Sequence, residues 1–243
     1  MESYSERYQR QIQLLGKETQ QKFANTRVLV IGAGGLGSPL LYYLAAAGVG
    51  KLRIVDGDVV SASNLNRQIL YTASDIGKQK AACAALRLQE LDPTIEVEAV
   101  TTPFEEETAG AFLKDCDVVA LAVDDLQTRV LANMLCCLGS IPLVDAGAGG
   151  YGGYVATMVP PKTHCLLSYL HDRPFERTNI QTLGAAAGII GAMEAMAVLR
   201  LLAGKQEAVG KIFFFDGSRW SGECVPFPDY DPCLTCKVHF PGK

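Results

Sequence analysis

The chain has 243 residues, of which 49% are hydrophobic and 20% charged, and its net charge is −4. This composition is that of a folded protein with a large core, and it excludes a disordered chain. The acidic balance argues against nucleic acid as the main partner, because duplex binding normally needs a basic face. Residues 1–20 are polar and charged, so we expect no secretory signal there. Eight cysteines without such a signal indicate reduced thiols, a metal site, or both, in a cytoplasmic protein.

The stretch 27–58 has the order of elements that is typical of a nucleotide-binding unit. Residues 28–31 form an apolar run that predicts a buried parallel strand, and the glycine turn 32–37 (G-x-G-x-x-G) follows at once. A helix is expected next, ended by Gly48, and then a second strand at 51–55. That strand leads into Asp56, 24 positions after the first glycine. Glycines let the backbone approach a phosphate, the helix N-terminus favours an anion, and the acid suits a ribose hydroxyl.

The remaining elements predict a mostly parallel sheet. After a polar helical leader at 1–26, further helices are expected at 78–91, 105–113, 125–138 and 183–203. Further strands are expected at 95–100, 117–123, 141–144, 154–159, 211–215 and 222–227. The apolar helix 183–203 contains Glu194 and Arg200, which favours a core or interface helix over a membrane span. We therefore predict one α/β domain over residues 1–243, with a Rossmann-like, mostly parallel sheet flanked by helices and extended by C-terminal antiparallel strands.

Charged and polar side chains gather where the second and fourth expected strands end. Arg67 and Lys80 suit the oxygens of a triphosphate, with Asn64 and Gln68 beside them, and Asp124 suits Mg²⁺. Taken singly, these residues have ordinary interpretations: Lys80 as a solvated helix lysine, and Asp124 as a helix N-cap. Their joint occurrence behind a glycine turn favours ATP chemistry over hydride transfer, which would also need a catalytic acid or base from a second domain.

On these motifs the chain resembles the ThiF/MoeB/HesA family, bacterial relatives of the ubiquitin-activating enzymes. The resemblance covers nearly the whole chain and is carried by residues 7–12 (RYQRQI), 32–37, 47–50, 56–58, 63–68, 77–80, 124, 188–191, 194–195 and 233–236. It implies a homodimer that adenylates the C-terminal glycine of a small ubiquitin-like sulfur carrier protein ending in Gly-Gly and releases pyrophosphate. Residues 27–145 would be the ATP-binding half and residues 146–243 the carrier-binding half.

The matching positions imply a role for each site residue. The resemblance implies that Asp56 holds the ribose, that Asp124 holds Mg²⁺ and that Arg10 reaches the ATP site of the neighbouring subunit. Arg67 and Lys80 would bind phosphate and serve catalysis. The full set of expected ATP contacts is Gly32, Gly34, Gly35, Gly37, Asp56, Asp58, Asn64, Arg67, Gln68 and Lys80. No general base is required, because the carrier's carboxylate is already ionised at pH 7.

The resemblance also implies a zinc site, of which one ligand is missing. Family members usually carry two C-x-x-C pairs; Cys233 and Cys236 keep the second, whereas the first reads Cys165-Leu-Leu-Ser168. Three thiolates and a histidine would still make a tetrahedral site, and the alternative is a lost site with ordinary buried thiols. The histidines available are His164, His171 and His239. We interpret four other cysteines as core or structural thiols: Cys83, Cys116, Cys136 and Cys137.

Several functional questions stay open on the sequence alone. The alternatives to carrier adenylation are adenylation of another carboxylate (a peptide, or one bound to tRNA), an NAD-dependent oxidoreductase, and an idle binding module. The glycine-rich run 146–153 has two interpretations, a path for the carrier's Gly-Gly tail or a flexible crossover loop. Because the loop 168–181 contains no cysteine, we expect adenylation without a stable thioester from this loop. The pathway served (thiamine, molybdopterin or another) is not encoded in these motifs.

Overall fold

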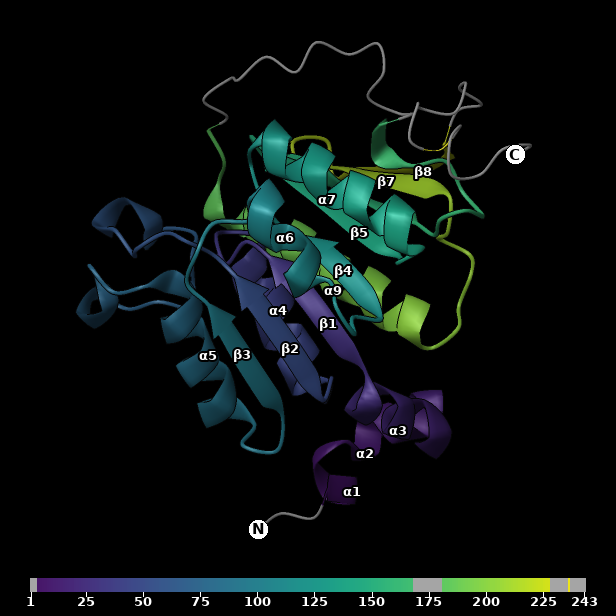
Figure 1. Ribbon diagram of the computed structural model, residues 1–243, viewed down its shortest axis with the longest axis horizontal. Coiled ribbons are helices and arrows are strands. Elements are labelled where there is room, and N and C mark those ends of the chain that lie inside the picture. Colours follow the sequence, from purple (N-terminus) through teal and green to yellow (C-terminus); the bar gives the residue numbers. More distant parts are fainter. Residues whose placement is uncertain (1–3, 168–180, 228–235, 237–243) are drawn as a thin grey trace.

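The computed structural model describes residues 4–167, 181–227 and 236 of the chain (Figure 1). In these residues eight strands form one sheet in the order β3-β2-β1-β4-β5-β6-β7-β8. The parallel part consists of β1 (Arg27–Ile31), β2 (Lys51–Val55), β3 (Glu96–Val100), β4 (Val118–Leu121) and β5 (Leu143–Gly149). The antiparallel extension consists of β6 (Gly152–Met158), β7 (Lys211–Asp216) and β8 (Ser221–Pro226). The predicted fold class is therefore confirmed.

Strand β1 lies at the point where the strand order reverses direction. The chain moves from β1 to β2 and β3 on one side, and then crosses to β4 on the other side of β1. The register pairs Ile31 at the end of β1 with Val55 of β2 and with Leu121 of β4. The loops that follow these three strands therefore meet at one edge of the sheet, which is where open α/β sheets bind ligands.

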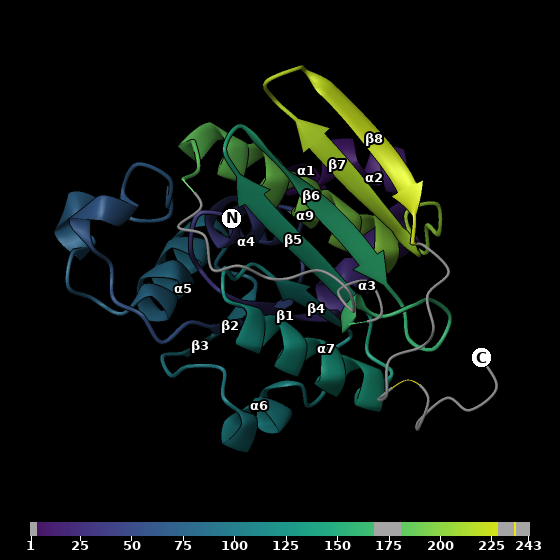
Figure 2. The ribbon, with the colours of Figure 1, turned by 90° about the horizontal axis from the view of Figure 1, so that it is seen from above.

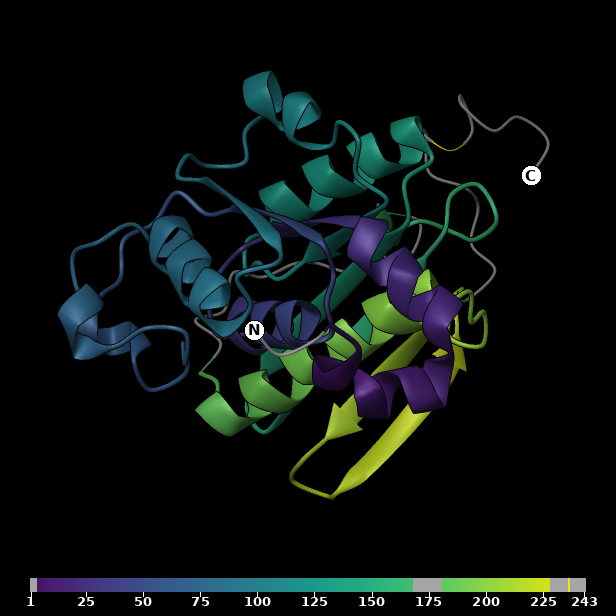
Figure 3. The same ribbon diagram turned by 90° about the horizontal axis from the view of Figure 1, so that it is seen from below.

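Helices cover both faces of the sheet and bury an apolar core on each (Figure 1 and Figure 3). One face is covered by α4 (Gly37–Ala46), α5 (Lys80–Leu91) and α9 (Gly184–Leu202), and the other by α6 (Glu106–Phe112) and α7 (Leu126–Gly139). Gly48 has a φ of +80° just after α4, so the helix ends as its glycine predicts. The apolar side chains of β1 and β4 are buried on both faces, as expected for central parallel strands.

The N-terminal leader forms three helices, α1 (Tyr4–Arg7), α2 (Gln9–Leu15) and α3 (Lys17–Asn25), at the edge where the parallel strands begin (Figure 3). Its buried polar groups hold it there. The Tyr8 hydroxyl donates to the carboxylate of Asp92, and the side-chain amides of Gln11 and Gln20 donate to the carbonyl of Ala47 at 2.8 and 3.0 Å. The leader is thus helical as predicted, and it is anchored to the ends of α4 and α5.

Helix α9 is long and apolar enough to cross a membrane by length and composition, but it lies inside this fold. It packs against α4 and against β5 and β6, with Ala187, Ile190 and Val198 buried. A carboxylate on the same helix, that of Glu194, is also fully buried. This packing agrees with the core helix expected from the sequence.

The glycine-rich run 146–153 forms an ordered hairpin, so its interpretation as a flexible crossover loop was wrong. Strand β5 continues to Gly149, and β6 begins at Gly152, with Ala148 opposite Gly153 (Figure 2). Glycines hide the strand from sequence analysis because they have a low β propensity. Here they are required: a Cβ on Gly153 would lie 2.2 Å from the carbonyl oxygen of Gly147 and 2.8 Å from Ile190 of α9.

The close contact between α4 and α9 depends on Gly191, which generates a first prediction. A Cβ at Gly191 would lie 2.3 Å from the carbonyl oxygen of Leu36, so Gly191→Ala forces the two helices apart. We expect it to lower the free energy of unfolding by about 1–3 kcal/mol, measured by urea denaturation. A Cβ on Gly188 of the same helix would meet no atom of another described segment within 4 Å, so Gly188→Ala is the control. It should be neutral or stabilising by up to about 1 kcal/mol; equal losses in both variants would contradict the packing argument.

Candidate functional site

The glycine turn 32–37 connects β1 to α4, and its first and last glycines are fixed by close backbone contacts. Gly32 has a φ of +95°, and a Cβ there would lie 2.5 Å from the carbonyl oxygen of Ala122. A Cβ on Gly37 would lie 2.2 Å from the carbonyl oxygen of Gly32. Among the described residues the N–H groups of Gly35, Leu36 and Gly37 donate no hydrogen bond, whereas that of Ser38 donates to the carbonyl of Gly34 at 2.9 Å. Such N–H groups, together with the helix dipole, favour a phosphate.

Asp56 connects the end of β2 to the glycine turn. One oxygen of its carboxylate accepts from the backbone N–H of Ala33 at 2.8 Å, and the other accepts from the N–H of Asp58 at 2.9 Å. Burial raises the pKa of Asp56, while the Ala33 hydrogen bond and the nearby Lys80 ammonium lower it. Each carboxylate oxygen has a second lone pair, so the group can still accept from a ribose hydroxyl.

Lys80 is the first residue of α5, and its side chain is buried at this site. Its Nζ donates to the Asp58 carboxylate at 2.7 Å; the lysine side chain is 8% exposed and that of Asp58 is 75% exposed. The interpretation of Lys80 as a solvated helix lysine was therefore wrong. The exposed carboxylate can swing away more easily than the buried ammonium, so an incoming phosphate can take the place of Asp58.

The segment 61–68 packs directly on the glycine turn. A Cβ on Gly35 would lie 3.3 Å from Cγ of Arg67, and one on Gly34 would lie 3.7 Å from Nε2 of Gln68. The Arg67 guanidinium donates to the carbonyl of Ser63 at 2.9 Å, which holds the arginine close to the turn. Gln68 is buried, and its Oε1 has no hydrogen-bond partner among the described residues. Such an orphaned acceptor beside a glycine turn fits a site that a polar ligand or water completes.

Asn64 has a structural role in the same segment. Its Oδ1 accepts from the backbone N–H of Ser61 at 3.1 Å, which forms half of a capping box around the 3₁₀-helix η1 (Ala62–Asn64). The side chain therefore shapes the loop that carries Arg67. A direct contact of Asn64 with the phosphates of ATP stays a prediction and would use its amide nitrogen, because phosphate oxygens accept and the nitrogen is a donor.

Asp124 follows β4, beside the glycine turn, and its side chain is exposed. Among the described residues it takes part in no hydrogen bond or ion pair. The N-cap of α7 is the next residue, Asp125, whose carboxylate accepts from the N–H of Thr128 at 2.7 Å. The interpretation of Asp124 as the cap was therefore wrong. An exposed carboxylate at the carboxyl end of a strand, next to a phosphate-binding turn, has the donor chemistry that Mg²⁺ requires.

The structure does not bring Arg10 to this site within one chain. Arg10 is an exposed residue of α2, at the edge where the parallel strands begin. The glycine turn and Asp56 lie at the opposite edge, where β1 and β2 end. Of the other expected ATP contacts, the glycine turn, Asp56, Lys80 and the segment with Arg67 and Gln68 come together.

A buried polar network behind the site was missed from the sequence. The guanidinium of Arg129, on α7, binds the carboxylate of Asp145, on β5, and donates to the Tyr154 hydroxyl at 3.1 Å. It also donates to the carbonyls of Val123 and Ala146. The network thus joins the segment that carries Asp124 to the glycine-rich hairpin. The sequence contained one indication of this network. Asp145 follows directly on the apolar run of a central strand, and a carboxylate buried there needs a partner.

The first half of α9 contacts both parts of the site. A Cβ on Gly184 would lie 2.2 Å from the carbonyl oxygen of Asn66, and one on Gly35 would lie 3.4 Å from Cβ of Ala187. The same helix contacts the hairpin through Ile190, as described above. The helix therefore sets the position of the Arg67 segment and the glycine turn relative to the hairpin.

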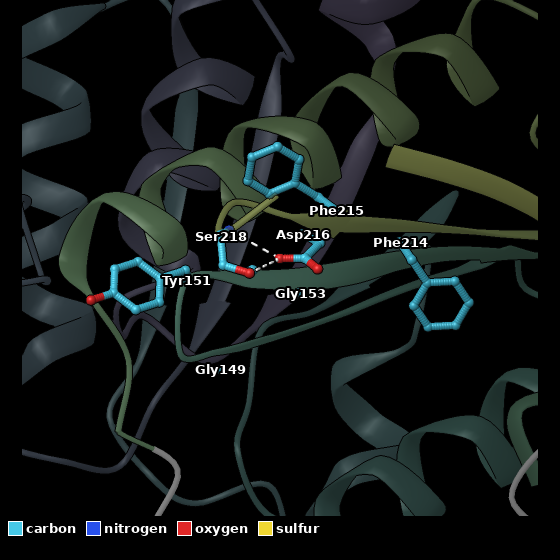
Figure 4. Close-up of a pocket in the computed structure, with 8 residues that line it drawn as sticks. Gly149, Tyr151, Gly153, Phe214, Phe215, Asp216 and Ser218 are labelled. Atoms are coloured by element: carbon cyan, nitrogen blue, oxygen red, sulfur yellow. Dashed lines mark hydrogen bonds between the residues drawn. The ribbon is translucent and has the colours of Figure 1, made fainter. Parts of the chain in front are cut away.

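An open hollow of about 410 Å³ lies at the tip of the hairpin and the adjoining turn of β7 and β8 (Figure 4). Its lining residues are Gly149, Tyr151, Gly152, Gly153, Phe214, Phe215, Asp216 and Ser218. Figure 4 shows Asp216 and Ser218 hydrogen-bonded to each other, with Tyr151 and Phe215 on either side. The hollow exposes the glycine backbone and contains none of the expected ATP contacts, so it is a surface separate from the phosphate-binding turn.

Three cysteine thiols come together beside α7. The Sγ atoms of Cys137, Cys165 and Cys236 all lie within 4.8 Å of one another. The interpretation of Cys137 as an ordinary core thiol was therefore incomplete. His164 does not belong to this group among the described residues. The expected ligand Cys233, its neighbour Ser168 and the candidate histidines His171 and His239 lie outside the described residues.

Glu194 generates a prediction about pH, because its carboxylate is fully buried and no side chain of the described residues donates a hydrogen bond to it. Burial, and next the negative charge of Asp145, raise its pKa well above the usual value, although the Arg129 charge and the backbone N–H of Leu121 oppose them. Between the unfolded and the folded pKa, the folded state holds a proton that the unfolded state has lost. Stability therefore falls as pH rises above the unfolded pKa, by up to about 1.4 kcal/mol per pH unit.

Replacing Glu194 removes this pH dependence. The free energy of unfolding of Glu194→Gln relative to the natural chain should thus increase from pH 4.5 upward, measured by urea denaturation at several pH values. A constant offset between the two proteins across pH 4.5 to 8 would show that Glu194 titrates normally.

Comparisons with known proteins match this architecture over nearly the whole chain. The model of the ThiF family matches residues 8–236. The SAMP-activating enzyme E1 of Haloferax volcanii is 36% identical over 239 residues, which cover 95% of this chain and 88% of that protein. The sulfur carrier protein ThiS adenylyltransferase of Escherichia coli is 37% identical over 226 residues, 88% of each chain. The structure of E. coli MccB with ATP has the same fold, with a TM-score of 0.84 at 21% identity over 95% of this chain and 74% of that one. The chain belongs to the ThiF family.

Proposed function

We propose that the chain is an ATP-dependent adenylyltransferase that activates the C-terminal glycine of a ubiquitin-like sulfur carrier protein. The observation that carries the proposal is the arrangement of Lys80, Arg67 and Asp56 around the glycine turn at the point where the strand order reverses. Relatives that share 36–37% of their residues with this chain are named for the activation of SAMP and the adenylylation of ThiS, and the match covers 88% of their length. An adenylyltransferase of this family uses ATP. The described residues of the site offer suitable groups for the ribose and the phosphates of that nucleotide.

Each part of ATP has a matching group in the site. The ribose hydroxyls would bind the Asp56 carboxylate, which faces the turn through its hydrogen bond to Ala33. The phosphates would bind the N–H groups at the start of α4, the Arg67 guanidinium and the Lys80 ammonium. Arg67 can bind two oxygens at once, and Lys80 acts as a compact charge. The buried Oε1 of Gln68 would accept a hydrogen bond from the nucleotide or from a water bound to it.

Asp124 fits the role of Mg²⁺ ligand, because its carboxylate is exposed beside the turn and binds no other described residue. When bound, Mg²⁺ supplies positive charge at the phosphate oxygens. The Arg129 network holds the backbone just before Asp124 through the carbonyl of Val123. The expected metal ligand would therefore follow a backbone segment that this network holds in place.

The proposed reaction joins two anions, so alignment and charge neutralisation are the main tasks of the protein. The carrier's terminal carboxylate attacks the α-phosphorus of ATP and forms a C–O–P bond. The bond between the α-phosphorus and the bridging oxygen breaks, and pyrophosphate leaves with its electron pair. Lys80 and Arg67 offset the charge that develops on the phosphates. No proton has to be removed, because the carboxylate is already ionised at pH 7.

The proposal includes two partners, the carrier and a second copy of the chain. The carrier's extended Gly-Gly tail would pass over the glycine-rich hairpin, where Gly149, Gly152 and Gly153 line the open hollow. Arg10, which lies far from its own glycine turn, would reach the ATP site of the neighbouring subunit. We still predict that the protein is a homodimer in the cytoplasm and that it binds neither nucleic acid nor a membrane.

The central prediction concerns ATP–pyrophosphate exchange in the presence of a ubiquitin-like carrier that ends in Gly-Gly. Lys80→Ala and Arg67→Ala should each lower the exchange rate about 10²–10³-fold, because each removes a positive charge from the developing phosphate charge. Both variants should stay folded, since Asp58 is exposed and can be solvated once Lys80 is gone.

Two controls make the exchange experiment specific. Lys78→Ala removes a lysine whose side chain is 59% exposed, two residues before Lys80, and should exchange at the natural rate. The same carrier without its last glycine should support no exchange with the natural chain. Natural exchange rates in both Lys80→Ala and Arg67→Ala, or exchange with the shortened carrier, would contradict the proposed function.

The homodimer prediction is tested by mixing two inactive variants. Arg10→Ala and Lys80→Ala should each be inactive alone, because every site lacks one cation. After unfolding and refolding together, half of the dimers are mixed, and one of their two sites is complete. Exchange should then return to about a quarter of the natural rate, as expected for a two-fold symmetric dimer. Activity that does not recover in the mixture, or full activity of Arg10→Ala alone, would place Arg10 outside the site.

A further inference from the structure

The cluster of Cys137, Cys165 and Cys236 brings together three segments that are far apart in the sequence. Cys137 lies in the last turn of α7, Cys165 follows β6, and Cys236 lies near the C-terminus. Their Sγ atoms all lie within 4.8 Å of one another. Cys137 and Cys165 are each 1% exposed, and together they form a separate small cluster of buried residues. Three thiols from three segments at one buried point call for a chemical explanation.

A second contact fixes the Cys165 segment on α7 independently of the thiols. The Oδ1 atom of Asn133 accepts from the backbone N–H of Leu166 at 2.8 Å. Asn133 lies one helical turn before Cys137, and residues four apart share a face of a helix. Asn133 and Cys137 therefore both face the segment that carries Cys165. The neighbouring Cys136 has a different environment, because it packs in the core between the sheet and α7.

The geometry and chemistry of the cluster fit a tetrahedral thiolate site. In such a site each Zn–S bond is about 2.3 Å, which places the sulfur atoms about 3.8 Å apart. The three thiols need to move by less than about 1 Å to reach that spacing. Soft thiolate ligands select zinc over Mg²⁺ or Ca²⁺.

The family resemblance already implies a structural zinc ion at Cys165 and Cys236; we infer that in this chain Cys137 supplies the thiolate that position 168 lacks, so that Cys137, Cys165 and Cys236 bind one zinc ion. Binding replaces the S–H bonds by S–Zn bonds, and each of these three thiols releases its proton to the solvent. The inference rests on the three described thiols alone, and it is independent of the proposed adenylyltransferase activity.

The first test measures zinc in protein purified under reducing conditions without chelators. We expect close to one zinc ion per chain in the natural protein and in Cys136→Ser, the matched control on the same helix. Loss of a residue that only supports a metal ligand lowers metal affinity about 10–100-fold. Because Cys137 is proposed as a ligand itself, Cys137→Ser should lower the zinc affinity by more than this, as measured by competition with a chelator. Unchanged zinc affinity in Cys137→Ser, or a natural protein without zinc, would overturn the inference.

The second test is a rescue that separates a metal ligand from a packing role. Ser168→Cys restores C-x-x-C spacing at Cys165, so the double variant Cys137→Ser with Ser168→Cys should regain zinc. The double variant remains informative if Cys137→Ser alone folds poorly. Any recovery of zinc content and of thermal stability then has to come from the thiol introduced by Ser168→Cys. A double variant without zinc would overturn the inference. So would a disulfide between Cys137 and Cys165 or Cys236 in the native protein, found by non-reducing peptide mass mapping.

Discussion

The site depends on one constraint, the reversal of strand order at β1. Because β2 and β4 both pair with β1, their carboxyl ends open at the same edge of the sheet as the glycine turn. The glycine turn is held to β4 by the close approach of Gly32 to Ala122, and to the end of β2 by the hydrogen bond from the Ala33 N–H to the Asp56 carboxylate. Loops that are distant in sequence thus meet around the start of one helix. This arrangement allows two anionic reactants to be held against positive charge.

A second requirement is that the charged groups stay in place before any ligand arrives. Lys80 is buried and held by an exposed carboxylate, and Arg67 is held by the backbone of its own loop. Behind them, Arg129 joins Asp145, Tyr154 and the backbone before Asp124. Preorganised charges need little rearrangement when the reaction begins, which is why such networks favour catalysis. Burying charged groups costs stability, and the fully buried carboxylate of Glu194 is where that cost should depend on pH.

Much of this architecture was predictable from the sequence, because it is encoded by local patterns. The strand at 51–55 was located to the residue, and the glycine turn, Asp56 and the final antiparallel strands were recognised from order and spacing. The hairpin at 146–153 was not, since glycines that permit close packing have the same local signature as glycines in a loop. The roles of Asp124 and Asp125 at the helix start differ by one residue, and only the backbone geometry separates them.

Long-range contacts explain what sequence analysis missed. Arg129 has the spacing of an ordinary helix arginine, and only the fold places Asp145 and Tyr154 opposite it. Cys137 looked like a core thiol next to Cys136, because neighbouring helix residues are indistinguishable until the helix faces are known. A residue that acts between subunits, as proposed for Arg10, leaves no contact within one chain. In each case the missing information was which surfaces meet.

The central claim is that the glycine turn, Lys80 and Arg67 surround the phosphates of ATP, and a crystal structure with a non-hydrolysable ATP analogue and Mg²⁺ tests it most directly. The account predicts phosphate oxygens within hydrogen-bond distance of the Lys80 ammonium and the Arg67 guanidinium, ribose hydroxyls on Asp56, and Asp58 released from Lys80. A bound analogue elsewhere on the chain, with Lys80 still paired to Asp58, would contradict it.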